Sequence, residues 1–108
     1  MVQDLGQVIF SPIKEVHIDG TQGTVLFDKG ICVQWGYAVI PGTGAEWDKI
    51  SLNRPFKNTN YNVQTTSYYR QDSHNTYLGV FRTDGFDIST DAPSKDQQGV
   101  YWLAIGEV

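Results

Sequence analysis

A run of nine residues, Ile31–Val39, alternates between large apolar side chains and small or polar ones. Its odd positions hold Ile, Val, Trp, Tyr and Val, whereas its even positions hold Cys, Gln, Gly and Ala. Successive side chains of a strand point to opposite faces of a sheet, so this period of two predicts a strand with one apolar face. The small residues on the other face indicate that another part of the protein packs close to the backbone there.

Six further segments are rich in Val, Ile, Thr, Tyr, Phe and Trp and are bounded by Gly, Pro, Asn or Asp. They predict strands at 24–27, 49–52, 61–69, 76–83, 86–90 and 100–105. The Asp84-Gly85 dipeptide is typical of a two-residue hairpin turn in which both residues have positive φ. Val100–Ile105 is apolar on both faces and is therefore expected to be central in a sheet or covered by another subunit. This spacing predicts an all-β fold, a small antiparallel β-sandwich of about six or seven strands.

The first 23 residues are less regular than the rest of the chain. Val8–Phe10 and Val16–Ile18 have the composition of short edge strands, but Gly6, Pro12, Gly20 and Gly23 interrupt this stretch. We therefore predict that residues 1–23 form an irregular N-terminal arm or connector. Residues 24–108 form one β-sandwich domain, a size that can bury a substantial core.

Charge and composition exclude several classes of partner. The chain carries a net charge of -4, and its eight Lys and Arg residues are scattered singly, so no basic stripe is available to bind nucleic acid. No apolar run approaches the roughly 20 residues of a membrane-spanning helix, so no membrane insertion is expected. The single cysteine, Cys32, cannot form an internal disulfide and is expected to be a buried, unreactive thiol.

The sequence contains no motif that indicates catalysis. Neither a His-Glu-x-x-His pattern, nor Gly-x-Ser-x-Gly, nor a phosphate-binding loop occurs. A pair of carboxylates that cleaves glycosidic bonds is a low-ranked alternative, and the candidates are Glu46, Asp48, Asp84, Asp87 and Asp91. We therefore expect that the protein is not an enzyme.

Several carboxylates between residues 84 and 97 resemble a potential cation site because hard oxygen ligands suit calcium. These residues are Asp84, Asp87, Asp91 and Asp96, and their spacing does not match a helix-loop-helix calcium motif. We interpret them as turn and solvated loop residues. No metal and no cofactor are expected.

Two segments, Tyr68–Asn75 and Ala45–Asp48, place aromatic side chains next to polar ones in predicted loops. Sugars present apolar C–H faces and hydroxyl rims, so aromatic rings can stack on them while charged and amide groups donate or accept hydrogen bonds. The candidate glycan-binding residues are Trp47, Tyr69, Arg70, Asp72 and His74. The alternative is that Trp47 and one Tyr only close the end of the sandwich.

Four motifs, taken in order, resemble a known family. They are Gly30–Gly36 with Gln34-Trp35-Gly36, then Ile50–Phe56 with Asn60–Val63, then Gly85–Ile88, and finally Tyr101–Gly106 with Trp102-Leu103-Ala104-Ile105-Gly106. Together they are similar to the C-terminal domain of bacteriophage and prophage tail-fibre proteins, over about residues 24–106. Leu52–Phe56 departs from the Phe-Pro-x-x-Phe that is common in that family. The order of elements also resembles H-type lectins, more loosely.

The resemblance implies a receptor-binding tip on a parallel homotrimeric fibre. Its partner would be a host-cell surface glycan, either lipopolysaccharide or capsule, or an outer-surface protein. The implied location is the virion, in a tail fibre or baseplate assembled in the bacterial cytoplasm. The final strand and the small face of Cys32, Gly36 and Ala38 would suit burial against neighbouring subunits. The alternatives are a trimerisation or capping module without receptor contact, and a free lectin of the H-type class.

Overall fold

A computed structural model of the chain describes residues 12–41, 47–68, 75–91 and 97–108. The described residues form eight strands, and none of them lies in a helix that could span a membrane. The strands are β1 (Ile13–Asp19), β2 (Gln22–Phe27), β3 (Ile31–Pro41), β4 (Asp48–Ser51), β5 (Asn62–Tyr68), β6 (Thr76–Arg82), β7 (Gly85–Thr90) and β8 (Gln97–Glu107). Seven of these eight coincide with predicted segments, and β1 is the addition.

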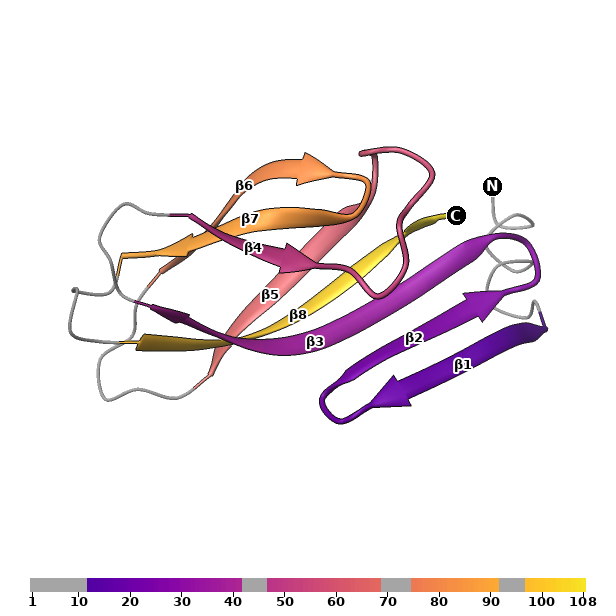
Figure 1. Cartoon of the computed structure of the whole chain (residues 1–108), viewed down its shortest axis with the longest axis horizontal. Helices are drawn as coiled ribbons and strands as arrows, with labels where there is room; N and C mark the ends of the chain where they lie inside the picture. The colour runs from indigo at the N-terminus through magenta and orange to yellow at the C-terminus, as the bar shows by residue number, and fades with distance from the viewer. Residues whose placement is uncertain (1–11, 42–46, 69–74, 92–96) are drawn as a thin grey trace.

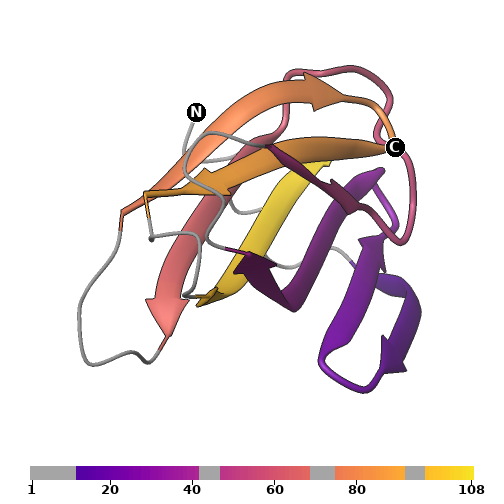
Figure 2. The same cartoon turned by 60° about the vertical axis from the view of Figure 1, so that its left-hand side comes forward.

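The strands are arranged in two antiparallel sheets that face each other (Figure 1). One sheet has five strands in the order β1-β2-β3-β8-β5, and the other has three in the order β4-β7-β6. Figure 2 shows the smaller sheet above β5, β8 and β3, while β1 and β2 extend to one side of it. The predicted all-β sandwich is therefore confirmed.

The strand β1 lies inside the stretch that we predicted to be irregular. It pairs with β2 through a tight turn at Gly20 and Thr21, where Gly20 has a φ of 61°. A glycine adopts this left-handed conformation without a steric penalty, so the residue that we interpreted as an interruption is the turn of a hairpin. Every side chain of β1 is exposed. The division of the chain at residue 23 stays a prediction.

The core lies between the two sheets and contains the even-numbered residues of β3. Cys32 and Gln34 are fully buried, and the adjacent β8 contributes Val100, Trp102 and Ala104. The opposing sheet contributes Ile50, Phe86 and Ile88. The remaining apolar core residues are Leu26, Ile40, Phe56, Tyr61 and Val63.

The close packing that we predicted on the small face of β3 is present, and Trp102 of the same chain provides it. A Cβ atom added to Gly36 would lie 2.6 Å from the indole ring of Trp102, so only a glycine fits at this position. The ring also makes an edge-to-face contact with Phe86 across the sandwich, with 5.7 Å between centroids. Our expectation that the face of Cys32, Gly36 and Ala38 packs against neighbouring subunits is therefore wrong, because this space is filled within the chain.

The hairpin between β6 and β7 turns one residue earlier than predicted. Its two connecting residues are Thr83 and Asp84, and Gly85 is the first residue of β7 without a positive φ. Gly85 is required for a different reason, since a Cβ atom there would collide with the carbonyl oxygen of Ile50. The Tyr61 hydroxyl lies 2.7 Å from the carbonyl oxygens of both Arg82 and Gly85, and it donates its one hydrogen to either of them at this end of the hairpin.

We expect Gly36→Ala to destabilise the protein, because the added methyl group must displace the Trp102 ring from a full core. Overpacking of this kind costs about 1–3 kcal/mol. Urea unfolding followed by circular dichroism measures this loss. The double variant Gly36→Ala/Trp102→Phe has a smaller ring at the contact and should recover part of it. An unchanged unfolding midpoint in Gly36→Ala would contradict this packing.

We also expect alkaline pH to reveal the burial of Cys32. Burial raises the pKa of the Cys32 thiol above its usual value of 9.0, because the folded protein disfavours the thiolate. The stability from the neutral thiol is fully present below the unfolded-state pKa and is lost as pH rises through the folded-state pKa. Between pH 7 and pH 10, the free energy of unfolding should therefore fall more in the wild type than in Cys32→Ala. Equal losses would argue against a buried thiol.

Candidate functional site

Of the five residues predicted to bind glycan, the structure places one. Trp47 immediately precedes β4 and is exposed, with 51% of its surface accessible. Tyr69, Arg70, Asp72 and His74 lie outside the described residues. The strand ends nearest to these residues lie together, since Pro41 pairs with Gln97, Tyr68 with Gly99, and Thr76 with Thr90. We call this the far end of the sandwich, opposite the C-terminus (Figure 1).

Trp47 lies on the outer face of the three-stranded sheet. Its ring reaches β6, where a Cβ atom added to Gly79 would lie 3.0 Å from ring atoms Cε3 and Cζ3 and 3.1 Å from the Cβ atom of Asp87. The Trp47 indole therefore packs against the backbone of Gly79. Tyr77 precedes Gly79 by two residues, points to the same face and is 46% exposed.

Two ion pairs lie on the same sheet, one beside this ring and the other at the turn between β6 and β7. Arg82 forms a bidentate pair with Asp87, with Nη1–Oδ1 and Nη2–Oδ2 distances of 2.7 and 3.2 Å. Lys49 donates from Nζ to Oδ2 of Asp84 at 3.1 Å. The hydrogen bond from Arg82 lowers the pKa of Asp87, and the hydrogen bond from Lys49 lowers the pKa of Asp84. We define the Trp47 surface as Trp47, Tyr77, Gly79, Arg82 and Asp87.

A network of hydrogen bonds links β6 and β7 at the far end. Asn75 donates its backbone N–H to Asp91 at 2.8 Å and its side-chain amide at 3.0 Å, while Thr90 donates to the carbonyl oxygen of Asn75. The carboxylates that we considered as cation ligands therefore have separate protein partners at Asp84, Asp87 and Asp91, and Asp96 lies outside the described residues. Within the described ranges, no three potential ligands converge on one point.

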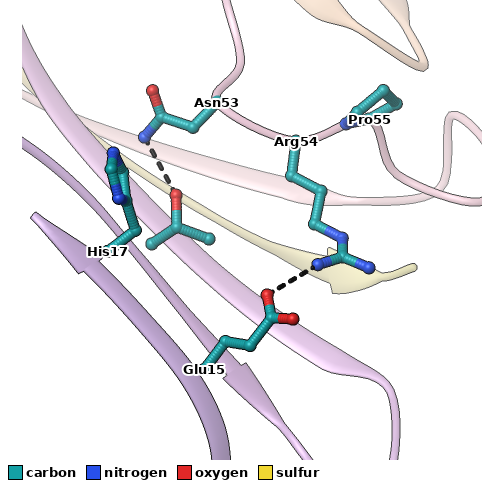
Figure 3. A pocket seen from close by; sticks show the side chains of 6 residues that line it. Glu15, His17, Asn53, Arg54 and Pro55 are labelled. Atoms are coloured by element: carbon teal, nitrogen blue, oxygen red, sulfur yellow. Dashed lines mark hydrogen bonds and ion pairs between the residues drawn. The ribbon is translucent and has the colours of Figure 1, made fainter.

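A cavity of about 260 Å³ lies between β1, β2 and the segment that follows β4 (Figure 3). Arg54 reaches across it to Glu15, with a distance of 3.0 Å between Nη1 and Oε2. Asn53 donates to the hydroxyl oxygen of Thr24 at 2.9 Å, and His17 projects from β1 toward the same space. Sequence reasoning missed this cavity because its residues come from distant segments.

The buried Gln34 holds this segment against β3. Its side-chain amide donates to the carbonyl oxygen of Arg54 at 2.7 Å and accepts from the Arg54 backbone N–H at 3.0 Å. A buried glutamine satisfied in this way acts as a substitute for a strand partner, since it pairs both backbone groups of one residue. This arrangement explains why a polar residue occupies the centre of the core face.

The outer face of the five-stranded sheet is apolar over β2, β3 and β8, and it becomes polar along the edge strand β5, where Asn62, Gln64 and Thr66 lie. The register places the odd-numbered residues of β2, β3 and β8 together on it, and only Glu107, at the end of β8, is charged among them. Tyr37, Tyr68 and Tyr101 form a cluster there, with ring centroids 4.8 to 6.1 Å apart. Exposed apolar residues continue across the sheet; they are Val16, Ile18, Val39, Leu103 and Ile105. A contiguous apolar patch on a folded protein marks a site of interaction.

Comparison with solved structures shows the same fold in tail fibres. The R2 pyocin fibre of P. aeruginosa superimposes with a TM-score of 0.65 at 21% identity, over 89% of this chain and 26% of that chain. An N-truncated R1-type pyocin tail fibre gives a TM-score of 0.63 at 13% identity, over 97% of this chain and 94% of that chain. The chain thus spans about a quarter of the longer R2 fibre chain.

No curated protein matches the chain. A family comparison matches residues 26–107, which include all of the sandwich strands from the end of β2 to β8. The matching family is described as tail fiber protein gp53-like, C-terminal. The chain therefore belongs to the gp53-like tail-fibre C-terminal domain family.

Proposed function

We propose that this domain is the receptor-binding tip of a tail fibre and that it attaches the particle to a host-cell surface polysaccharide as a homotrimer. The family match supports the fibre assignment. The proposal includes lipopolysaccharide or capsule as the receptor, incorporation into the virion after assembly in the bacterial cytoplasm, and no catalytic step. An outer-surface protein is the alternative receptor.

The single observation that carries the proposal is the division of the sandwich into two unlike faces. The outer face of the five-stranded sheet displays apolar side chains such as Val39, Leu103 and Ile105, which are 37–48% exposed. The outer face of the three-stranded sheet instead displays Trp47 among charged groups. The first face suits burial, and the second suits contact with a hydrated ligand.

A second copy of the chain is the occupant that suits the apolar face. A fibre requires its subunits to associate, and burial of this face around a threefold axis would remove its apolar residues from water. The Tyr37, Tyr68 and Tyr101 cluster adds aromatic surface, which is enriched at protein interfaces. In such a contact, the outward residues Tyr101, Leu103 and Ile105 of β8, which lies between β3 and β5, would be buried.

Association through this face directs the receptor surface outward. The two sheets lie on opposite sides of the core, so a trimer that buries the larger sheet leaves the smaller one on its periphery (Figure 2). The Trp47 surface would then occur three times around each tip. Shallow sugar sites bind weakly one at a time, and several linked copies raise the avidity through effective concentration.

The second candidate function is a trimerisation or capping module without receptor contact. The apolar outer face favours it equally, because that face needs only a second copy of the chain. Binding of a fluorescently labelled domain to a panel of bacterial strains separates the two. Saturable binding to some strains supports a receptor-binding tip, whereas a trimer that binds no strain supports the capping module.

We expect the purified chain to have three times its 12.1 kDa mass in size-exclusion chromatography with light scattering. Leu103→Asp introduces a charge into the apolar face, which burial would leave without a partner, and should yield monomers that retain the circular dichroism of a β-protein.

The matched control is Val80→Asp, a substitution of an exposed residue on β6 of the smaller sheet, which should leave the trimer intact. A wild-type monomer would contradict the proposed association, and a hexamer would favour a free lectin of the H-type class. Retention of the trimer in Leu103→Asp would move the interface to another face.

A further inference from the structure

We infer that the Trp47 surface is a saccharide subsite, in which the Trp47 indole stacks on a neutral pyranose ring and the Arg82–Asp87 pair binds the hydroxyl groups at its rim. This inference rests on the proposed attachment function and specifies the surface and the ligand chemistry for it. Tyr77, Arg82 and Asp87 were not among the glycan-binding residues that the sequence indicated, and Asp87 was considered there only as a catalytic carboxylate or a cation ligand.

The Trp47 indole is supported on one side by the backbone of Gly79. Ring atoms of Trp47 lie against the backbone of Gly79, where no side chain intervenes, while half of the residue remains accessible to solvent. A ring supported on one side and open on the other is a rigid apolar platform. The C–H face of a pyranose can cover it and remove apolar surface from water without a change in the protein.

Two charged side chains lie beside the Trp47 indole. The Asp87 Cβ atom lies near the same Gly79 position as the ring, so the carboxylate projects next to the indole. Its bidentate partner Arg82 holds it in place, and the guanidinium retains N–H groups directed away from the carboxylate. A pair of adjacent hydroxyls can thus donate to Asp87 and accept from Arg82, both with charge assistance.

The charge of the surface selects the class of saccharide. Arg82 and Lys49 are each paired with a carboxylate, of Asp87 and Asp84 respectively, so the four groups carry no net charge. The whole chain carries a net charge of -4. A polyanionic chain would find no free cation among these groups and would be repelled by the remainder of the protein, whereas a neutral pyranose avoids both penalties.

The cavity beside Arg54 lacks these features. Its guanidinium is paired with Glu15, and the residues that line it include no aromatic side chain other than His17. The smaller sheet therefore provides the better platform for a ligand that reaches the fibre from outside.

The test measures binding of the labelled 108-residue chain to an array of purified bacterial O-antigen and capsular polysaccharides, both neutral and anionic. In parallel, the same labelled protein is added to the bacteria from which these polysaccharides derive. Trp47→Ala should reduce the binding signal at least tenfold, and Asp87→Asn should reduce it severalfold. Gly79→Val keeps every polar group but displaces the ring, so it should also reduce binding. Val80→Ala, on the same strand, is the matched control and should bind as the wild type does.

Thermal unfolding and light scattering establish that each variant is folded and has the wild-type oligomeric state before its binding is compared. Wild-type binding to neutral polysaccharides, lost in Trp47→Ala and retained in Val80→Ala, supports the subsite. Equal binding by Trp47→Ala, or wild-type binding to anionic polysaccharides alone, overturns it.

Two further outcomes separate the subsite from the attachment function. Binding to bacteria without binding to any polysaccharide on the array overturns the subsite and leaves the attachment function in place, with a protein receptor. Binding to neither bacteria nor polysaccharides overturns both.

Discussion

The packing of the core depends on the contact between Trp102 and Gly36, which are partners on the neighbouring strands β8 and β3. The indole of Trp102 lies over a position where even a Cβ atom would be 2.6 Å away, and its other side meets Phe86 of the opposing sheet. The Trp102 ring on β8 thus contacts both β3 of the same sheet and β7 of the smaller sheet. Because interiors are packed to near-crystalline density, the small residues of β3 are needed for this ring to fit.

This packing directs the large residues of β3 outward. The core side of the strand is occupied by Trp102 and by Gln34, so the apolar odd-numbered residues such as Val33 and Tyr37 lie on the opposite face with those of β8. The consequence is a sandwich with an apolar outer surface on its larger sheet. Such a surface is costly for a monomer and useful for a fibre subunit, which links the internal packing to the proposed association.

The smaller sheet has a different role because its outer face is polar around one exposed indole. The Trp47 ring packs against Gly79, and the Arg82–Asp87 ion pair lies beside that ring. The proposed subsite depends on the same physical device as the core, a glycine that admits an aromatic ring to the backbone. In the core the ring is covered on both sides, whereas at Trp47 one side remains available to a ligand.

The sequence by itself determined the fold class, the positions of seven of the eight strands and the family resemblance, because period-two alternation and the order of motifs are local properties of the chain. It also indicated Trp47 as a candidate binding residue next to polar residues, with closure of the sandwich end as the alternative, and the structure shows that Trp47 is exposed. Only the tertiary structure decided which face of β3 is internal, since Ile31–Val39 alone favours burial of its larger residues, and the partner that reverses this preference, Trp102, lies far along the chain. The same reason explains why Tyr77, Arg82 and Asp87 were missed: their proximity to Trp47 arises from the pairing of β4, β7 and β6, which no local pattern records.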